Sequence, residues 1–74
     1  MNFTAQRIAA LQDEARREAK TAVADLTSQL RELATLAQAI GGRGDAVPVG
    51  IREIASRLVP TLTGSADTIQ KLDR

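Results

Sequence analysis

Apolar side chains recur every three or four residues along the first half of the chain, and this period limits the fold more than any other feature of the sequence. The apolar positions are Ile8, Leu11, Ala15, Ala19, Ala22, Leu26, Leu30, Leu33, Ala37 and Ile40. Their mean step is about 3.56 residues, between the 3.5 of a supercoiled helical seam and the 3.6 of a straight α-helix. A β-strand repeats every two residues, so no strand gives this pattern. Because no Pro or Gly interrupts residues 4–40, the sequence predicts one long α-helix there.

The two ends of this helix carry capping signals. Thr4 is the predicted N-cap, and Phe3 and Ile8 then occupy positions that can close a hydrophobic staple. Gly41 stands where a left-handed residue commonly ends a helix. The stripe is broad and rich in leucine near Gly41 and is reduced to alanines toward its start. We therefore expect the main apolar core near the glycine end, because each alanine buries little area.

A glycine-rich loop over residues 41–47 precedes a second helical segment, predicted over 48–73. The apolar positions of this segment are Ile51, Ile54, Leu58, Leu62, Ile69 and Leu72. Pro48 suits the first helical position, where a missing N–H costs nothing. The apolar spacing continues through Pro60 and Gly64, which favours one kinked helix. The alternative is a break near 60–64, with Ser65 capping a short third helix.

These features predict an all-α fold in a single domain over residues 1–74, with the second helix folded back antiparallel on the first. The second segment would reach roughly 37 Å along a first helix of about 55 Å. The first turns of the long helix, which carry Phe3, Ile8 and Leu11, then have no intramolecular cover. Amphipathic hairpins of this kind commonly dimerise into a four-helix bundle, where every stripe faces a common core. We therefore expect a homo-oligomer, with a dimer as the first choice.

The residue types that most often carry chemistry are scarce. The chain has no Cys, His or Tyr, which removes the commonest nucleophiles, bases and soft metal ligands. Glu14 and Glu18 lie one helical turn apart, but the charged residues around them are typical of a solvated helix face. The glycines at 41–44 lack the Gly-Lys-Ser/Thr end of a phosphate-binding loop. We expect no enzymatic activity, no cofactor and no metal.

Charge is nearly balanced, with a formal net charge of +1. Nucleic-acid-binding proteins usually carry a basic excess, because phosphate neutralisation supplies most of their non-specific affinity. A dimer could still align Arg17, Lys20 and Arg31 with basic residues of the second segment, so a nucleic-acid-binding helical-hairpin dimer is the alternative function, and nucleic acid is the less expected partner. No stretch approaches the roughly 20 apolar residues of a membrane span, so we expect no membrane partner and a cytoplasmic location.

The sequence is thus interpreted as a small protein–protein interaction module, an adaptor, regulator or assembly subunit, that acts through self-association of amphipathic helices. A different protein that binds the N-terminal arm as a helix in a groove is the second partner considered. The arm is expected to contact a subunit other than its own. The predicted interface residues are Phe3, Ile8, Leu11, Ala15, Ala22, Leu26, Leu30, Leu33, Ile40, Ile51, Ile54, Leu58 and Leu62.

Overall fold

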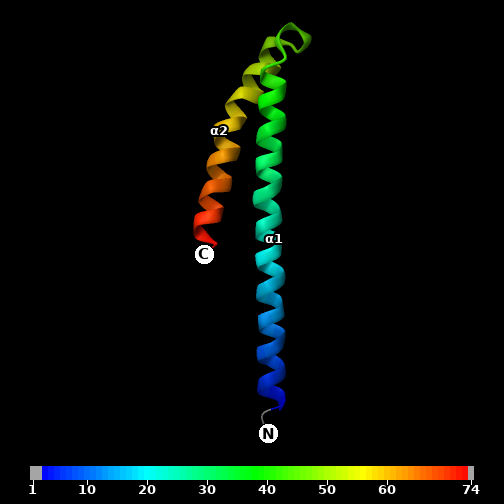
Figure 1. Cartoon of the computed structure of the whole chain (residues 1–74), viewed down its shortest axis with the longest axis vertical. Helices are drawn as coiled ribbons and strands as arrows, with labels where there is room; N and C mark the ends of the chain where they lie inside the picture. The colour runs from blue at the N-terminus through cyan, green and yellow to red at the C-terminus, as the bar shows by residue number, and fades with distance from the viewer. Residues whose placement is uncertain (1–2, 74) are drawn as a thin grey trace.

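Two α-helices joined by a short turn make up the computed structural model, which describes residues 3–73 (Figure 1). Helix α1 spans Phe3–Gly41, a single 3-10 turn η1 spans Gly44–Ala46, and helix α2 spans Val49–Leu72. The molecule measures 70 × 19 × 13 Å. Its smallest dimension is about the diameter of one helix, so the two helices form a single layer. The expected all-helical fold, with two helices packed against each other, is confirmed for the described residues.

The start of α1 differs from the prediction. Phe3 is already helical, so Thr4 lies within the first turn and is not the N-cap. Phe3 and Ile8 are five residues apart in one helix, which places them about 140° apart around its axis. The side chain of Phe3 is 86% exposed. The predicted staple between Phe3 and Ile8 is therefore wrong, because a staple requires Phe3 to precede the helix.

The connection lies in the expected loop, but its left-handed residue falls three positions later than predicted. Gly41 is the last residue of α1, and the Gly42 N–H still donates to the Gln38 carbonyl at 3.1 Å. The left-handed backbone conformation falls at Gly44, with φ of 65°. The prediction of a left-handed Gly41 was therefore wrong. The Val47 N–H donates to the Gly44 carbonyl at 3.1 Å and closes the 3-10 turn.

Helix α2 is continuous from Val49 to Leu72, so the alternative of a break near 60–64 is not observed. Pro60 has no N–H for the carbonyl four residues before it, yet the other bonds of the helix continue on both sides. Pro48 adopts extended backbone angles just before the helix rather than in its first turn. Its carbonyl accepts the Arg52 N–H at 3.0 Å, and the Arg52 Nε donates to the Val47 carbonyl at 2.9 Å. Through these two hydrogen bonds Arg52 links the turn to the first turn of α2.

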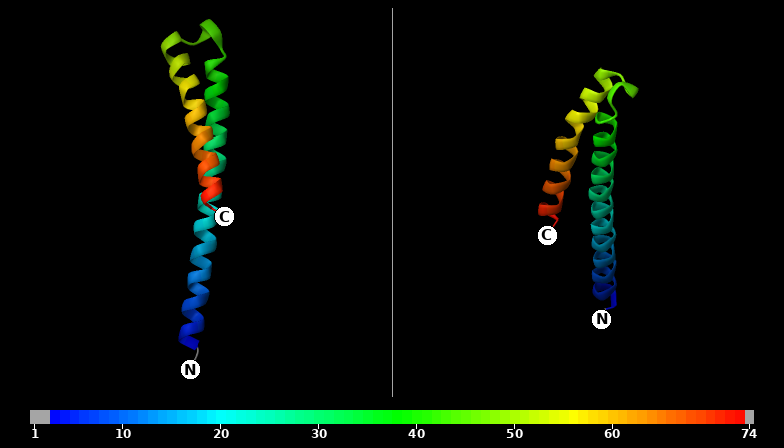
Figure 2. Two further views of the ribbon diagram at one scale, coloured as in Figure 1. Left: turned by 90° about the vertical axis from the view of Figure 1, so that its left-hand side faces the viewer. Right: turned by 45° about the horizontal axis from the view of Figure 1, so that its top comes forward.

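The helices run antiparallel, and α2 lies along the second half of α1 (Figure 2). The only buried side chains among the described residues are four alanines, Ala34, Ala37, Ala55 and Ala66. On α1 one series of buried and half-buried positions advances by four and three residues in turn, the step of a helix seam, and the half-buried Arg31 and Ile40 lie beside it. These seam positions are Val23, Thr27, Leu30, Ala34, Ala37 and Gly41.

The hairpin core is therefore made of small residues along the contact between the helices, and not of the leucine-rich stripe. Leu33 and Leu36 remain 50% and 56% exposed. The physical reason is close approach of the helices: a Cβ built on Gly41 would lie 2.6 Å from the Ser56 Oγ. Helices that meet through glycine and alanine bring their backbones together and leave larger side chains beside the contact.

Candidate interaction surface

An apolar groove runs between α1 and α2 on one face of the hairpin, at the end that carries the turn. Its lining comes from both helices and contains no charged or polar side chain. The residues of this groove are Leu33, Leu36, Ala37, Ile40, Ile51, Ile54, Ala55, Leu58 and Leu62. Ile54 is 58% exposed and Leu58 is 44% exposed, although both are large aliphatic side chains. The groove is thus a concave surface on which large aliphatic side chains from both helices are open to solvent.

The groove forms because each helix carries two adjacent stripes, one small and one large. Leu33 directly precedes the buried Ala34, and Ile54 directly precedes the buried Ala55. One residue corresponds to about 100° of rotation around a helix, so the large side chains lie to one side of the alanine contact. Because the helices are antiparallel and both leave their large stripe on the same side, the two stripes face each other across the alanine seam.

The first half of α1 has no cover from α2. Every residue from Phe3 to Ala22, a segment that we call the overhang, is exposed. Ile8, Ala15 and Ala22 are spaced by seven residues, and Leu33 and Ile40 repeat the same spacing further along the helix. A step of seven is close to two helical turns, so these positions lie on nearly the same side of α1. The overhang therefore extends the groove's α1 stripe toward the N-terminus.

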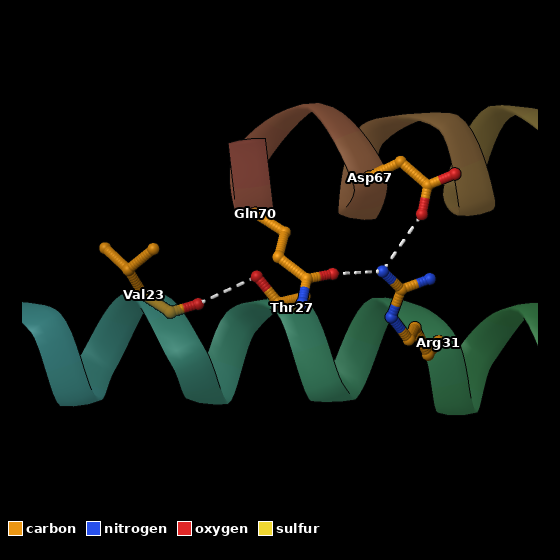
Figure 3. Close-up of polar contacts among 5 residues, drawn as sticks. All are labelled: Val23, Thr27, Arg31, Asp67 and Gln70. Carbon is orange, nitrogen blue, oxygen red and sulfur yellow. Dashed lines mark hydrogen bonds and ion pairs between the residues drawn. The ribbon is translucent and has the colours of Figure 1, made fainter. Parts of the chain in front are cut away.

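A polar contact joins the helices at the end of α2 (Figure 3). The Arg31 Nη2 donates to the Asp67 Oδ1 at 2.9 Å and to the Gln70 Oε1 at 2.7 Å. Nearby, the Thr27 Oγ1 donates to the Val23 carbonyl within α1 at 3.1 Å. Both charged side chains remain about half exposed, so the ion pair contributes about 0–1 kcal/mol. It joins α1 to the C-terminal part of α2, across 36 residues of sequence.

The predicted interface residues lie in the groove, along the overhang stripe and its continuation, in the seam, or on the other side of the overhang. Leu33, Ile40, Ile51, Ile54, Leu58 and Leu62 line the groove. Ile8, Leu11, Ala15 and Ala22 lie on the overhang, and Leu26 follows it on the same stripe. Leu30 is half-buried in the seam, whereas Phe3 lies on the other side of the overhang. The structure thus brings six of the predicted residues together in one groove.

Some residues that shape this surface were absent from the predicted interface. Ala34, Ala55 and Ala66 form the seam, and Leu36 completes the α1 wall of the groove. The signal was present in the sequence: the small or short residues Thr27, Ala34 and Gly41 recur every seven residues, one position after Leu26, Leu33 and Ile40. Leucine is more hydrophobic than alanine, so the hydropathy pattern follows the leucines, and the alanine stripe beside them is not apparent from it.

The charged residues give no comparable site. Arg16, Arg31, Arg52 and Arg57 each lie within 4.0 Å of a carboxylate oxygen. Within residues 3–73, no group of three or more acidic side chains is placed to hold a metal ion. The helices of that range also include none with the length and apolar character needed to cross a membrane.

No protein-family model, curated protein or solved structure matches the chain at a significant level. The candidate site is defined by geometry: the groove, and the overhang stripe that continues it.

Proposed function

We propose that this protein is a protein–protein interaction module that acts by self-association, with the groove as the centre of the interface. The observation that supports this proposal is the uncharged lining of the groove, whose large side chains are half exposed in one copy of the chain. A contiguous apolar patch of this kind on a small protein commonly marks a binding surface.

The energetics of the single hairpin favour association. Only alanines are buried between the helices, and each contributes little burial. Five exposed large aliphatic residues line the groove: Leu33, Leu36, Ile51, Ile54 and Leu58. Full burial of an exposed Leu or Ile side chain stabilises by about 1.5–3 kcal/mol, so covering these half-exposed side chains adds a part of that free energy for each. Chains of this size commonly add such cover by oligomerisation. A second copy supplies an equally apolar surface, which a charged partner such as nucleic acid does not.

A matched pair of substitutions on α1 tests the proposal. Leu33 lines the groove and Thr35 is exposed two residues later, about 200° away around the helix. We expect the wild-type chain to sediment as a dimer, Leu33→Asp to sediment as a helical monomer, and Thr35→Asp to remain dimeric. Circular dichroism establishes that each variant is still helical.

Two outcomes would contradict the proposal. A wild-type chain that stays monomeric at high concentration has no self-association, and equal dimerisation of both variants would show that the groove is not the interface. Binding of duplex DNA or RNA at low salt by the monomeric chain would support the alternative function instead.

A further inference from the structure

We infer that the groove of one copy is filled by the overhang of a second copy, which lies antiparallel to the α1 helix that lines it. This inference rests on the proposed self-association and specifies its partner segment. It explains two surfaces together: the groove, which has large apolar side chains and no cover, and the overhang, which has an apolar stripe and no neighbour.

The positions of the large side chains determine the register. Ile8 and Leu11 are the exposed large aliphatic residues on the overhang, and Leu36 and Leu33 are the exposed leucines of the groove's α1 wall. Antiparallel packing places Ile8 opposite Leu36 and Leu11 opposite Leu33 at the same time, because both pairs are symmetric about residue 22. The two-fold axis of the dimer therefore passes beside Ala22.

The side chains near this axis suit close packing. Ala15, Ala19 and Ala22 follow the stripe toward the axis, and small residues allow two helices to approach each other. Farther from the axis, opposite the groove, the overhang carries the larger Ile8 and Leu11. The large side chains of the overhang thus lie opposite the groove, and its alanines lie near the axis.

The side chain of Arg17 on the overhang stays in solvent in this arrangement. Arg17 lies two residues from Ala15, about 200° around the helix, so its side chain points away from the groove. The groove lining has no charged group that would need a partner. Each half of the dimer then has three helices in cross-section: α1 and α2 of one copy and the overhang of the other.

Groove-to-groove packing is the competing arrangement. It would cover the groove residues of both copies but would centre the dimer near Leu33 and leave both overhangs, with Ile8 and Leu11, uncovered. The overhang-in-groove dimer covers both surfaces within one interface. Since burial of apolar area drives association, it is the arrangement that the exposed side chains favour.

Distances between spin labels distinguish the two arrangements, and the chain is suited to them because it has no cysteine. Ala24 and Ala39 are exposed and do not line the groove. In the overhang-in-groove dimer, labels on Ala24→Cys lie about 6 Å apart along the rod axis and labels on Ala39→Cys about 51 Å apart. In groove-to-groove packing centred near Leu33 the order reverses, at about 27 Å and about 18 Å.

Double electron–electron resonance on the two full-length single-cysteine chains gives these distances. A short Ala24 distance with a long Ala39 distance supports the inference. The reverse order, or two short distances from a parallel dimer, overturns the inference but leaves self-association intact. An absence of intermolecular coupling at both positions, with a monomeric mass, contradicts the proposed function as well.

A second variant pair measures the contribution of the overhang. Ile8→Asp should raise the dimer dissociation constant by about 10- to 100-fold, because it places a charge where an isoleucine would be covered. Ala10→Asp, on the opposite side of the overhang, is the matched control and should leave the constant nearly unchanged. Equal constants for Ile8→Asp and the wild type would overturn the inference, whereas loss of association in Leu33→Asp alone would still support the groove as the interface.

Discussion

Gly41 of α1 and Ser56 of α2 meet so closely that a Cβ on the glycine would lie 2.6 Å from the serine hydroxyl oxygen. The next nearest atoms, the Arg52 carbonyl oxygen and the Ser56 backbone nitrogen, are at an ordinary 3.6 Å. The hydroxyl is therefore the main obstacle to a side chain at Gly41. The two helices are therefore in close contact next to the turn.

A double-mutant cycle tests this contact. Gly41→Ala gains helix propensity but must displace the Ser56 hydroxyl, so we expect a smaller stability gain, or a loss, in the wild-type background than in Ser56→Ala. The coupling between the two substitutions should be about 0.5–1.5 kcal/mol in the free energy of unfolding by urea, measured at one protein concentration. Strict additivity would show that the helices are farther apart than the structure places them.

The alanine seam should not tolerate larger residues. Ala66 has no exposed surface, so Ala66→Leu should separate the helices and lower the free energy of unfolding by about 1–3 kcal/mol. Ala39→Leu, at an exposed position of α1, is the control and should change stability by less than about 0.5 kcal/mol. If Ala66→Leu stabilised the protein, the seam would have to lie elsewhere on α2.

Loss of the cation that links the helices should have a small, salt-dependent cost. Arg31→Gln removes the ion pair with Asp67 and should lower the free energy of unfolding by about 0.5–1 kcal/mol at low salt, and by less at high salt. Arg16→Gln breaks a pair with Asp13 that lies within α1, so it serves as the control for loss of a charge that does not join the helices. Urea unfolding at two salt concentrations compares them, and equal losses for the two variants would count against a linking role for Arg31.

The inferred dimer places like charges near its axis. In the register centred on Ala22, Glu18 of one copy lies within about one residue, roughly 1.5 Å along the axis, of Asp25 of the other copy. Glu18→Gln should therefore lower the dimer dissociation constant by about two- to fivefold, and added salt should tighten the wild-type dimer. Glu53→Gln on α2 is the control, since Glu53 does not line the groove. Association that weakens with salt would contradict this register.

The sequence was sufficient to predict the two helices and the turn between them. The three- and four-residue spacing of apolar side chains is a local signal, and the glycines at 41–44 and Pro48 mark the interruption. The continuity of α2 could not be predicted from these local signals. Pro60 and Gly64 each have a low helix propensity, which is equally compatible with a break in the helix.

The rotation of each helix could not be predicted from the same pattern. Leu33 and Ala34 are neighbours in sequence, and both belong to stripes with a period near 3.5. Hydropathy favours the leucine as the buried residue, yet the close contact at Gly41 and Ser56 buries the alanine. The pairing of Arg31 with Asp67 spans 36 residues, so no local spacing specifies it. The position of the groove depends on how the helices are rotated against each other, and the contacts of Gly41 with Ser56 and of Arg31 with Asp67 both join residues far apart in the sequence.

Sedimentation equilibrium of the wild-type chain over a wide concentration range tests the central claim, that the groove is covered by a second copy. We expect the mass to rise with concentration to twice the chain mass of 7.9 kDa. A single species of 7.9 kDa at every concentration, with the helical content of the hairpin retained, would contradict it.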